Sequence, residues 1–514
     1  MRLASIFTDH MVLQRDKEIV VWGTCNNDSK NIVVTLNGNS INSIIKNGKW
    51  TASLPKMEAG GPYEMNVTNE DETIIIKDIM LGDVWLAGGQ SNMELKLKDS
   101  LNGQEVVKGA GNKNIRYYNT PRIPYIEDED LKSGKILQEE NEKWNLCTKE
   151  TAGNLSAVAY YFAKDLSKKL GVTIGIIDCN WGGTSVTCWI SREYLDKEEA
   201  ASSYLKVYDE IVRNKSDEQY DKELNEYNEE YPKWVERVDS LIKVKPKATW
   251  VEINEIAGRS PWPPPMGRKS AFRPAGLYKT MLSKVSPYGL KGFIYYQGEE
   301  DTYKASLYSD LMVLLIKQWR DDWQEKLPFL FVQLPMFIGN GDKDDKYWAV
   351  LRDEQKKVYK TVEKTGLAIG IDCGEFDNIH PVEKETIGSR LAVEAFKIAY
   401  GIEGYKDYPE YKSHEIIKDK ILLYFNNMGN KIKIKGDNEN INSFEIADAS
   451  LNYLPAKVEI IENTIILSND EISKPENARY AWTNYGETPI YSEFDLPLVP
   501  FTTYNNLYVN TEKE

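Results

Sequence analysis

From Asp83 to Gly401 the sequence alternates short apolar runs with amphipathic stretches, and this alternation constrains the fold more than any other feature. Helices and glycine-containing turns are predicted to separate the apolar runs, and Gly171 and Gly401 end two of the helices. Strands that alternate with helices imply a mostly parallel sheet with helices on both faces, so the predicted fold class is three-layer α/β. The predicted strands lie at 84–87, 172–177, 293–296, 329–333 and 367–371, and the helices at about 157–170, 306–319 and 381–400.

Short β-branched runs separated by turns flank the α/β region on both sides and predict β-rich modules. A chain of 514 residues is expected to contain several domains. The predicted domains are a β-sandwich-like module at 1–79, a catalytic domain at 80–405 and a β-rich module at 406–514. Within the second domain, about 192–265 is a predicted insertion. Its charged first part favours a helical hairpin lying on the surface, and its proline-rich end, which carries Trp262, is a loop that could roof a pocket.

Composition excludes several classes of function. The formal net charge of −15 would repel phosphate backbones, which argues against a nucleic-acid partner. No apolar run approaches the roughly 18 residues that a membrane span requires. The first residues contain no signal-peptide core, so a cytoplasmic location is expected unless an export leader has been removed. The 5 cysteines are widely spaced and are expected to be buried hydrophobes rather than a disulfide frame or a zinc site.

The motif Gly-Gly-Gln-Ser-Asn-Met at 88–93 follows a predicted buried strand. Its two glycines allow a sharp turn that presents Ser91 near the start of a helix, where the Ser91 N–H has no helical partner. In an open α/β sheet, ligands bind at the carboxyl ends of the strands. Ser91 is therefore a candidate nucleophile. The alternative is that Ser91 only caps a helix.

A second motif, Asp-Asn-Ile-His-Pro at 377–381, offers the base that a serine nucleophile needs. The spacing of three allows Asp377 to reach the ring of His380 from a single turn. The chain has 3 histidines. His10 and His414 have no comparable carboxylate at a predicted sheet edge, which leaves His380 as the candidate base.

Two further turns offer donors for an oxyanion. Trp-Gly-Gly-Thr at 181–184 exposes the N–H groups of Gly182 and Gly183, and Gln297 supplies a carboxamide at the end of the next strand. The acidic run at 299–301 could instead indicate a metal site. Because no histidine or cysteine pattern lies near it, a transition metal is not expected, while a hard cation such as Ca²⁺ stays open.

Taken in order, these motifs resemble those of the SGNH (GDSL-like) hydrolases, and most closely the sialate O-acetylesterase branch with its related carbohydrate acetylesterases. The resemblance covers nearly the whole chain. The segments that carry it lie at 7–15, 21–23, 83–94, 180–184, 291–299, 379–381, 388–392, 478–482 and 500–501.

The resemblance implies a flavodoxin-like three-layer fold and a serine carbohydrate O-acetylesterase. It implies a triad of Ser91, His380 and Asp377 that needs no cofactor and no metal. The oxyanion hole would combine the Ser91 N–H, the Gly183 or Gly182 N–H and the Gln297 side chain, where the family name records an asparagine. The expected partner is an O-acetylated mono- or oligosaccharide. Residues considered for contact with the substrate are Gln90, Gly182, Trp181, Glu299 and Arg273, with Arg352 and Trp262 as further pocket walls.

Two alternatives stay open. One is an acetyl xylan esterase or an esterase for another plant polysaccharide, with the same catalytic residues and a different pocket. After Gln-Gly-Glu the branch often continues Ser-Asn, whereas this chain has Glu300 and Asp301. An acidic pair in contact with the sugar would suit neutral hydroxyls better than the carboxylate of a sialic acid. The other alternative is a carbohydrate-binding protein without activity.

Overall fold

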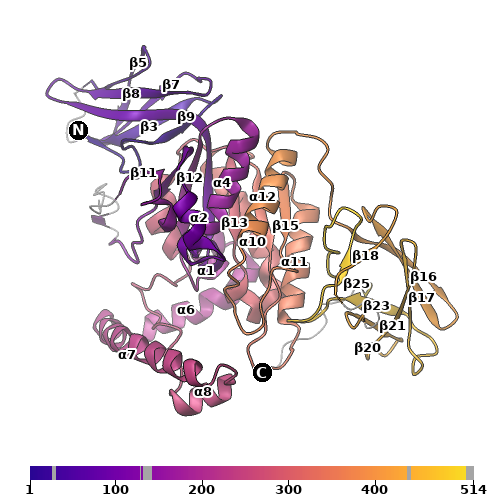
Figure 1. Ribbon diagram of the computed structural model, residues 1–514. Coiled ribbons are helices and arrows are strands. Elements are labelled where there is room, and N and C mark those ends of the chain that lie inside the picture. Colours follow the sequence, from indigo (N-terminus) through magenta and orange to yellow (C-terminus); the bar gives the residue numbers. More distant parts are fainter. Residues whose placement is uncertain (26–30, 128, 131–141, 437–440, 505–514) are drawn as a thin grey trace.

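The computed structural model describes residues 1–25, 31–127, 129–130, 142–436 and 441–504 (Figure 1). Its centre is a sheet in which parallel strands follow the order β10–β12–β9–β13–β14–β15, and β11 pairs antiparallel with β10 at one edge. The α/β class is thus confirmed. The strands are β9 (Thr73–Gly89), β10 (Asn112–Asn119), β11 (Trp144–Cys147), β12 (Ile174–Asn180), β13 (Gly292–Tyr296), β14 (Phe329–Gln333) and β15 (Thr365–Ile369).

The strand order changes direction at β9. If β10 is set aside, the order β12–β9–β13–β14–β15 is the flavodoxin-like arrangement, in which the first strand of the sheet lies between the second and the third. The chain leaves β9 toward β10 and β12 but leaves β13 toward β14, so a crevice is expected at the carboxyl ends of β9 and β13. The candidate nucleophile Ser91 follows that end directly.

Helices cover both faces of this sheet. Trp85 of β9 packs edge-on against Phe162 of α4, whereas a side chain at Gly88 would meet Trp319 of α10. Since residues 85 and 88 point to opposite faces of a strand, α4 and α10 lie on opposite sides. Helix α12 packs with α4, and α11 packs with α10. Their bounds are α4 (Ala157–Leu170), α10 (Tyr308–Asp322), α11 (Tyr347–Thr361) and α12 (Glu385–Ile398).

Helix α4 matches its predicted bounds, and Gly171 ends it in the left-handed conformation with φ 69°. Helix α12 begins at Glu385 rather than at Pro381 as predicted. The intervening residues are held in a loop because the Val382 N–H donates to Glu375 Oε1 (2.7 Å) instead of entering the helix.

The N-terminal β module is continuous with the central sheet through β9. Strand β9 begins at Thr73, where it pairs with β8 of the module. It then continues past the predicted domain boundary at residue 79 and ends at Gly89 in the central sheet. Arg15 of the module binds Asp83 of β9 through Nε and Nη2, both at 3.0 Å. The strands are β1 (Arg2–Leu3), β2 (Val12–Gln14), β3 (Ile19–Thr24), β4 (Val33–Leu36), β5 (Asn39–Asn42), β6 (Ile44–Lys46), β7 (Lys49–Leu54) and β8 (Gly60–Thr68).

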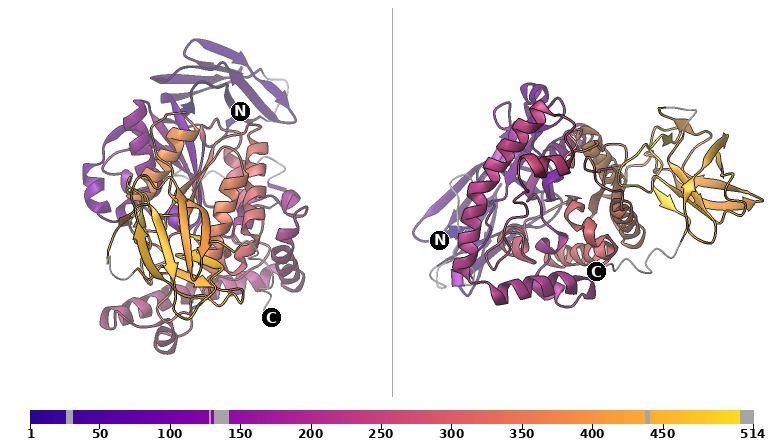
Figure 2. Two further views of the ribbon diagram at one scale, coloured as in Figure 1. Left: turned by 90° about the vertical axis from the view of Figure 1, so that its right-hand side faces the viewer. Right: turned by 90° about the horizontal axis from the view of Figure 1, so that it is seen from below.

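The C-terminal β module lies to the side of the central region, away from the N-terminal module (Figure 2). It contacts the central region through polar groups. The Tyr491 hydroxyl donates to Asp372 (3.1 Å), which also binds Arg390, and the Asn484 N–H donates to Asp344 (2.9 Å). Its strands are β16 (Glu410–Ile417), β17 (Lys420–Asn426), β18 (Lys433–Ile434), β19 (Phe444–Ala447), β20 (Leu454–Pro455), β21 (Lys457–Ile461), β22 (Thr464–Ser468), β23 (Asn477–Tyr480), β24 (Ile490–Tyr491) and β25 (Phe501–Thr502).

The insertion after β12 is helical, and α6, α7 and α8 lie beyond the end of the sheet at which α1 is found (Figure 1). Ser216 and Thr249 form capping boxes that begin α7 and α8. Within the described residues, no helix is both long enough and apolar enough to cross a bilayer. The insertion helices are α5 (Arg192–Leu195), α6 (Ser202–Asn214), α7 (Asp217–Val244) and α8 (Trp250–Ile256). The short remaining helices are α1 (Ser91–Glu94), α2 (Gly103–Gly109), α9 (Ser283–Val285), η1 (Leu97–Asp99), η2 (Ala152–Asn154), η3 (Val186–Trp189), η4 (Glu199–Ala201), η5 (Tyr278–Leu282) and η6 (Glu299–Leu307).

Candidate active site

The turn that carries Ser91 requires its glycines. Gly89 has φ 132°, and a Cβ at this position would lie 2.1 Å from the Tyr296 carbonyl oxygen of the neighbouring strand. A Cβ at Gly88 would lie 2.8 Å from the Trp319 ring. The turn is therefore pressed between β13 and α10, and only glycine fits at both positions. This packing fixes the point at which Ser91 leaves the sheet.

Ser91 and His380 open into one cavity of about 760 Å³. The sheet side supplies part of its wall, and the helical insertion supplies much of the rest. The lining residues are Gln90, Ser91, Glu94, Leu95, Lys96, Asp99, Arg122, Trp181, Gly182, Gly183, Tyr231, Trp234, Trp250, Ser260, Trp262, Phe272, Glu299, Glu300, Ile379 and His380. The cavity thus joins residues from four predicted turns, as expected for the carboxyl edge of the sheet.

The backbone around His380 is held by side chains on either side of it. The His380 N–H donates to Asn378 Oδ1 (3.0 Å), and Asn378 Nδ2 donates to Glu375 Oε2 (2.8 Å). Asn92, the residue after the candidate nucleophile, donates from Nδ2 to the Ile379 carbonyl (2.9 Å). The last bond ties the histidine turn directly to the helix of Ser91.

Asp377 lies on the same turn as His380 but outside the cavity lining. Its φ of 59° is left-handed, and its Oδ1 accepts from the Asn340 N–H (2.8 Å). Across the described chain, no hydrogen bond joins Asp377 to the His380 ring, or that ring to the Ser91 hydroxyl. One carboxylate oxygen of Asp377 is thus engaged with the backbone, while Oδ2 keeps its capacity to accept.

The pKa of His380 is lowered from its ordinary value of 6.5. Desolvation by the surrounding wall is the largest cause, and the positive charge of Lys384 acts in the same direction. The negative charge of Glu94 opposes both. A lowered pKa keeps the imidazole neutral at physiological pH, which is the form that can accept a proton.

The Trp181–Thr184 segment lies against Ser91. A Cβ built on Gly182 would be 3.3 Å from Ser91 Cβ and 3.2 Å from Glu94 Oε2. The Gly182 N–H already donates to that Glu94 oxygen (2.6 Å). Of the two predicted glycine donors, Gly183 is therefore the one whose N–H is not committed within the described structure.

Gln297 is oriented differently from its predicted use. It is 1% exposed, and its Nε2 donates to the Thr184 carbonyl (3.1 Å) and to Asp301 Oδ2 (2.5 Å). Its Oε1 accepts from the Tyr308 hydroxyl (2.9 Å). Both amide protons are thus engaged, and Gln297 does not belong to the cavity lining. As an oxyanion donor it would first have to release one of these bonds.

The acidic run separates into three different environments. Asp301 is fully buried and accepts from Ser185, Val186, Gln297 and Tyr204, and burial raises its pKa. Glu300 lines the cavity, where desolvation raises its pKa to about 8. The predicted acidic pair therefore does not act together, because only Glu300 of the two reaches the cavity.

Glu299 belongs to a buried polar network behind Ser91. Its Oε1 accepts from Asn92 Nδ2 (2.5 Å), and the Asn92 Oδ1 accepts from Lys384 Nζ (2.6 Å). Desolvation lowers the pKa of Lys384 to about 8 and raises that of Glu299. Among the described residues, no group of three His, Cys, Asp or Glu side chains is placed to hold a metal ion.

The remaining predicted contact residues divide into two groups. Gln90, Trp181, Gly182, Glu299 and Trp262 line the cavity. Arg273 does not; it is buried, donates to the Pro124 carbonyl (2.7 Å) and packs 5.2 Å from the Tyr125 ring centre. Arg352 is also buried away from the cavity and donates to the Thr483 carbonyl. Both arginines serve packing.

Aromatic side chains of the helical insertion also line the cavity, which was not predicted from the sequence. Tyr231 and Trp234 of α7 and Trp250 of α8 join its lining, although the insertion was expected to lie on the surface as a hairpin. A signal was present, because Tyr231 and Trp234 are three residues apart and so share a helix face within an otherwise charged segment.

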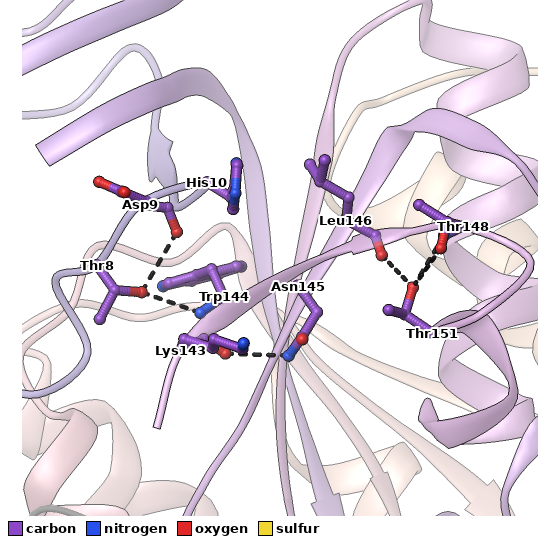
Figure 3. A pocket seen from close by; sticks show the side chains of 9 residues that line it. All are labelled: Thr8, Asp9, His10, Lys143, Trp144, Asn145, Leu146, Thr148 and Thr151. Carbon is purple, nitrogen blue, oxygen red and sulfur yellow. Dashed lines mark hydrogen bonds between the residues drawn. The ribbon is translucent and has the colours of Figure 1, made fainter. Parts of the chain in front are cut away.

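A second pocket, of about 530 Å³, lies around His10 near the N-terminal module (Figure 3). Contrary to prediction, His10 has a carboxylate partner: its Nδ1 lies 2.6 Å from Asp78 Oδ2. The hydroxyls in this lining belong to threonines, however, and Thr8 Oγ1 is engaged with the Asp9 carbonyl (3.3 Å) and the Trp144 N–H (3.0 Å). His380 thus stays the histidine that shares a cavity with a candidate nucleophile.

Comparison with known proteins gives consistent matches. Residues 266–397 match the family described as carbohydrate esterase, sialic acid-specific acetylesterase. The chain is 27% identical to the sialate O-acetylesterase of Mus musculus, over 97% of this chain and 94% of that protein. It is 25% identical to the Homo sapiens protein of the same name, over 98% and 92%. The crystal structure of a carbohydrate acetylesterase from Xanthomonas citri matches with a TM-score of 0.76 and 28% identity, over 98% of this chain and 99% of that one.

Proposed function

We propose that this chain, like the esterases to which it is similar over nearly its whole length, is a carboxylic ester hydrolase that removes O-acetyl groups from sugars with Ser91 as nucleophile. His380 is the general base, and Asp377 is the carboxylate that orients it, in an SGNH-type fold. The observation that carries the proposal is the shared cavity, in which Ser91, His380 and the Gly182–Gly183 turn meet at one sheet edge.

In the first half of the reaction, neutral His380 takes the proton of the Ser91 hydroxyl as its oxygen attacks the acetyl carbonyl. The N–H groups of Ser91 and Gly183 donate to the oxyanion that forms. His380 then gives the proton to the departing sugar hydroxyl, which leaves an acetyl group on Ser91. In the second half, water loses a proton to His380 and attacks this acetyl group, so acetate and free Ser91 result.

Asp377 fits the role of orienting residue through its two oxygens. Oδ1 is held by the Asn340 N–H, and Oδ2 is left to accept from the Nδ1–H of His380, a bond that the described structure does not contain. A carboxylate in this place selects the tautomer whose Nε2 accepts the serine proton.

The cavity wall suits a carbohydrate. Aromatic rings from two sides of the chain line it, namely Trp181, Tyr231, Trp234, Trp250, Trp262 and Phe272. Flat apolar rings can cover the C–H faces of a sugar, and the polar residues between them can bind its hydroxyls. Similarity to esterases over nearly the whole chain, with Ser91 and His380 intact, argues against the alternative of a binding protein without activity.

For the sugar itself, a neutral acetylated oligosaccharide is the candidate that the charges favour over a sialic acid. The two basic side chains in the lining are already paired, Lys96 with Asp178 (3.0 Å) and Arg122 with Glu94 (2.7 Å). Glu300 also faces the cavity, and with its pKa raised to about 8 it is a mostly neutral group that can form hydrogen bonds with sugar hydroxyls. A substrate carboxylate would have to displace one of the existing ion pairs, whereas neutral hydroxyls would not.

The Ser91→Ala variant tests the nucleophile. We expect kcat for 4-nitrophenyl acetate to fall about 10⁵-fold, because no other group can form the acetyl intermediate. The control is Ser283→Ala, which removes an exposed hydroxyl outside the cavity, and both variants are checked for an unchanged melting temperature. A folded Ser91→Ala protein with near-normal turnover excludes the serine mechanism.

Acetate release from three substrate classes tests the sugar. O-acetylated sialic acids, acetylated xylo-oligosaccharides and acetylated manno-oligosaccharides are compared by kcat/KM with the wild-type protein. We expect a neutral oligosaccharide to give the highest value. A preference for the sialic acid contradicts the charge argument but leaves the serine mechanism intact.

A further inference from the structure

Glu94 connects three parts of the candidate site. It is the last residue of α1, the short helix that begins with Ser91. Its Oε2 accepts from the Gly182 N–H (2.6 Å), and its Oε1 binds Arg122 Nη1 (2.7 Å). The guanidinium of Arg122 in turn lies 5.8 Å from the centre of the Trp181 ring. One carboxylate thus joins the nucleophile helix to the Gly182 N–H and, through Arg122, to the Trp181 ring and the loop after β10.

We propose that Glu94 is a positioning residue that sets the oxyanion hole by holding the Gly182 N–H, so that the Gly183 N–H joins the Ser91 N–H at the acetyl oxygen. The proposal rests on the function proposed above. Glu94 follows Gly-Gly-Gln-Ser-Asn-Met directly in the sequence, and no role was predicted for it.

The glycine turn needs another group to fix the directions of its N–H groups. Gly182 and Gly183 carry no side chain that could orient their peptide groups, and Gly183 has φ 67°, a conformation that glycine adopts easily and can also leave easily. A carboxylate that accepts the first N–H removes this freedom. Because Glu94 and Ser91 lie on the same helical turn, the position of the glycine turn is fixed relative to the nucleophile itself.

A negative charge near an oxyanion would oppose catalysis if it stood alone. Arg122 offsets it, because its guanidinium binds the Glu94 oxygen that does not hold Gly182. The pair therefore supplies a hydrogen-bond acceptor for the turn at little net charge. This explains why a carboxylate can occupy the cavity wall beside the reacting atoms.

Glu94 also influences the base. The charged groups that act on His380 are Lys384, which lowers its pKa, and Glu94 from the facing helix, which raises it. Removal of the Glu94 charge should therefore lower the pKa of His380 further. A purely structural contact would not move this titration, so the acid limb of the pH profile reports specifically on the charge.

Two variants separate the acceptor from the charge. Glu94→Ala removes both, and we expect kcat for 4-nitrophenyl acetate to fall about 100-fold, with a smaller change in KM, because a misplaced oxyanion donor affects the transition state most. Glu94→Gln keeps an acceptor for the Gly182 N–H, so we expect kcat within about fivefold of wild type. Its acid limb of kcat/KM should lie at lower pH than that of the wild type. Glu105→Gln, which changes an exposed carboxylate on α2, is the matched control.

The outcomes decide the proposal independently of the nucleophile. If Glu94→Ala folds and keeps kcat within twofold of wild type while Ser91→Ala is inactive, the positioning role is wrong and the serine mechanism stands. If Glu94→Ala does not fold, Glu94→Asp decides, because it keeps the charge but withdraws the acceptor from the Gly182 N–H: a fall in kcat supports the positioning role, and kcat within twofold of wild type overturns it. Activity in Ser91→Ala would instead overturn the proposed function on which this inference rests.

Discussion

The two turns that carry Ser91 and His380 are held in different ways. The nucleophile turn, residues 88–93, is enclosed by β13 and α10, and its glycines leave no room for a Cβ. The histidine turn, residues 375–380, lies in a loop whose bonds are mostly between its own residues and the backbone. The first turn is thus fixed by packing of the sheet, and the second by a small set of hydrogen bonds.

This difference indicates where adjustment can occur during the reaction. A nucleophile must stay in register with the oxyanion donors, and dense packing achieves that. A base must instead move its ring slightly as it receives and returns a proton. The side-chain bond from Asn92 to the Ile379 carbonyl keeps the two turns together without enclosing the ring.

The largest expected loss of activity in the histidine turn is at His380, and it tests whether this turn carries the base. We expect His380→Ala to lower kcat/KM for 4-nitrophenyl acetate about 10⁵-fold, since the other two histidines lie outside the cavity. The measurement is steady-state turnover, with His414→Ala as the control on the C-terminal module. Comparable losses in the two variants would mean that the effect arises from the fold rather than from the base.

A smaller effect is expected at Asp377, and it tests whether this carboxylate orients the ring of His380. If Asp377 Oδ2 orients the ring, Asp377→Asn should lower kcat about 10²- to 10⁴-fold, because the amide favours the wrong tautomer. The bond between Oδ1 and the Asn340 N–H can be retained by the asparagine, so stability should change little. Wild-type turnover in this variant would remove Asp377 from the triad and leave Glu94 as the carboxylate that acts on His380.

The smallest expected effect concerns pH. Desolvation and Lys384 lower the pKa of His380, so the ring stays neutral down to more acidic pH than a free histidine would. We therefore expect kcat/KM to be constant near neutrality and to fall on acidification with a midpoint below 6.5. The profile is measured from pH 4 to 8 with a correction for enzyme stability. A midpoint above 6.5 would show that the histidine turn is held by a stronger negative field than the structure contains.

The sequence predicted the elements that depend on local patterns. The strand before Ser91, the helix ending at Gly171 and the glycine turn at 181–184 follow from apolar periodicity and from glycine, which act over a few residues. They were sufficient to place Ser91, His380 and Gly183 at one edge of the sheet.

What the sequence could not predict depends on partners distant along the chain. Gln297 was expected to face the substrate, but the Thr184 carbonyl, 113 residues away along the chain, binds one of its amide protons, and the neighbouring Asp301 binds the other. His10 was expected to have no comparable carboxylate at a sheet edge, but folding brings Asp78 to it from 68 residues away. Which of several polar groups is committed to a buried network is decided by tertiary packing, which local spacing does not record.

Strand β9 runs without a break from the N-terminal module to the residue before Gln90. A slip of one residue along such a strand exchanges its two faces and moves its end by about 3.4 Å. The pairing of the N-terminal module with β9, together with the bond from Arg15 to Asp83, therefore fixes the register of this strand and with it the position of Ser91. A change in the pairing of β2 or β8 with β9 would therefore displace Ser91 relative to the oxyanion donors, even though the N-terminal module contributes no described residue to the cavity lining.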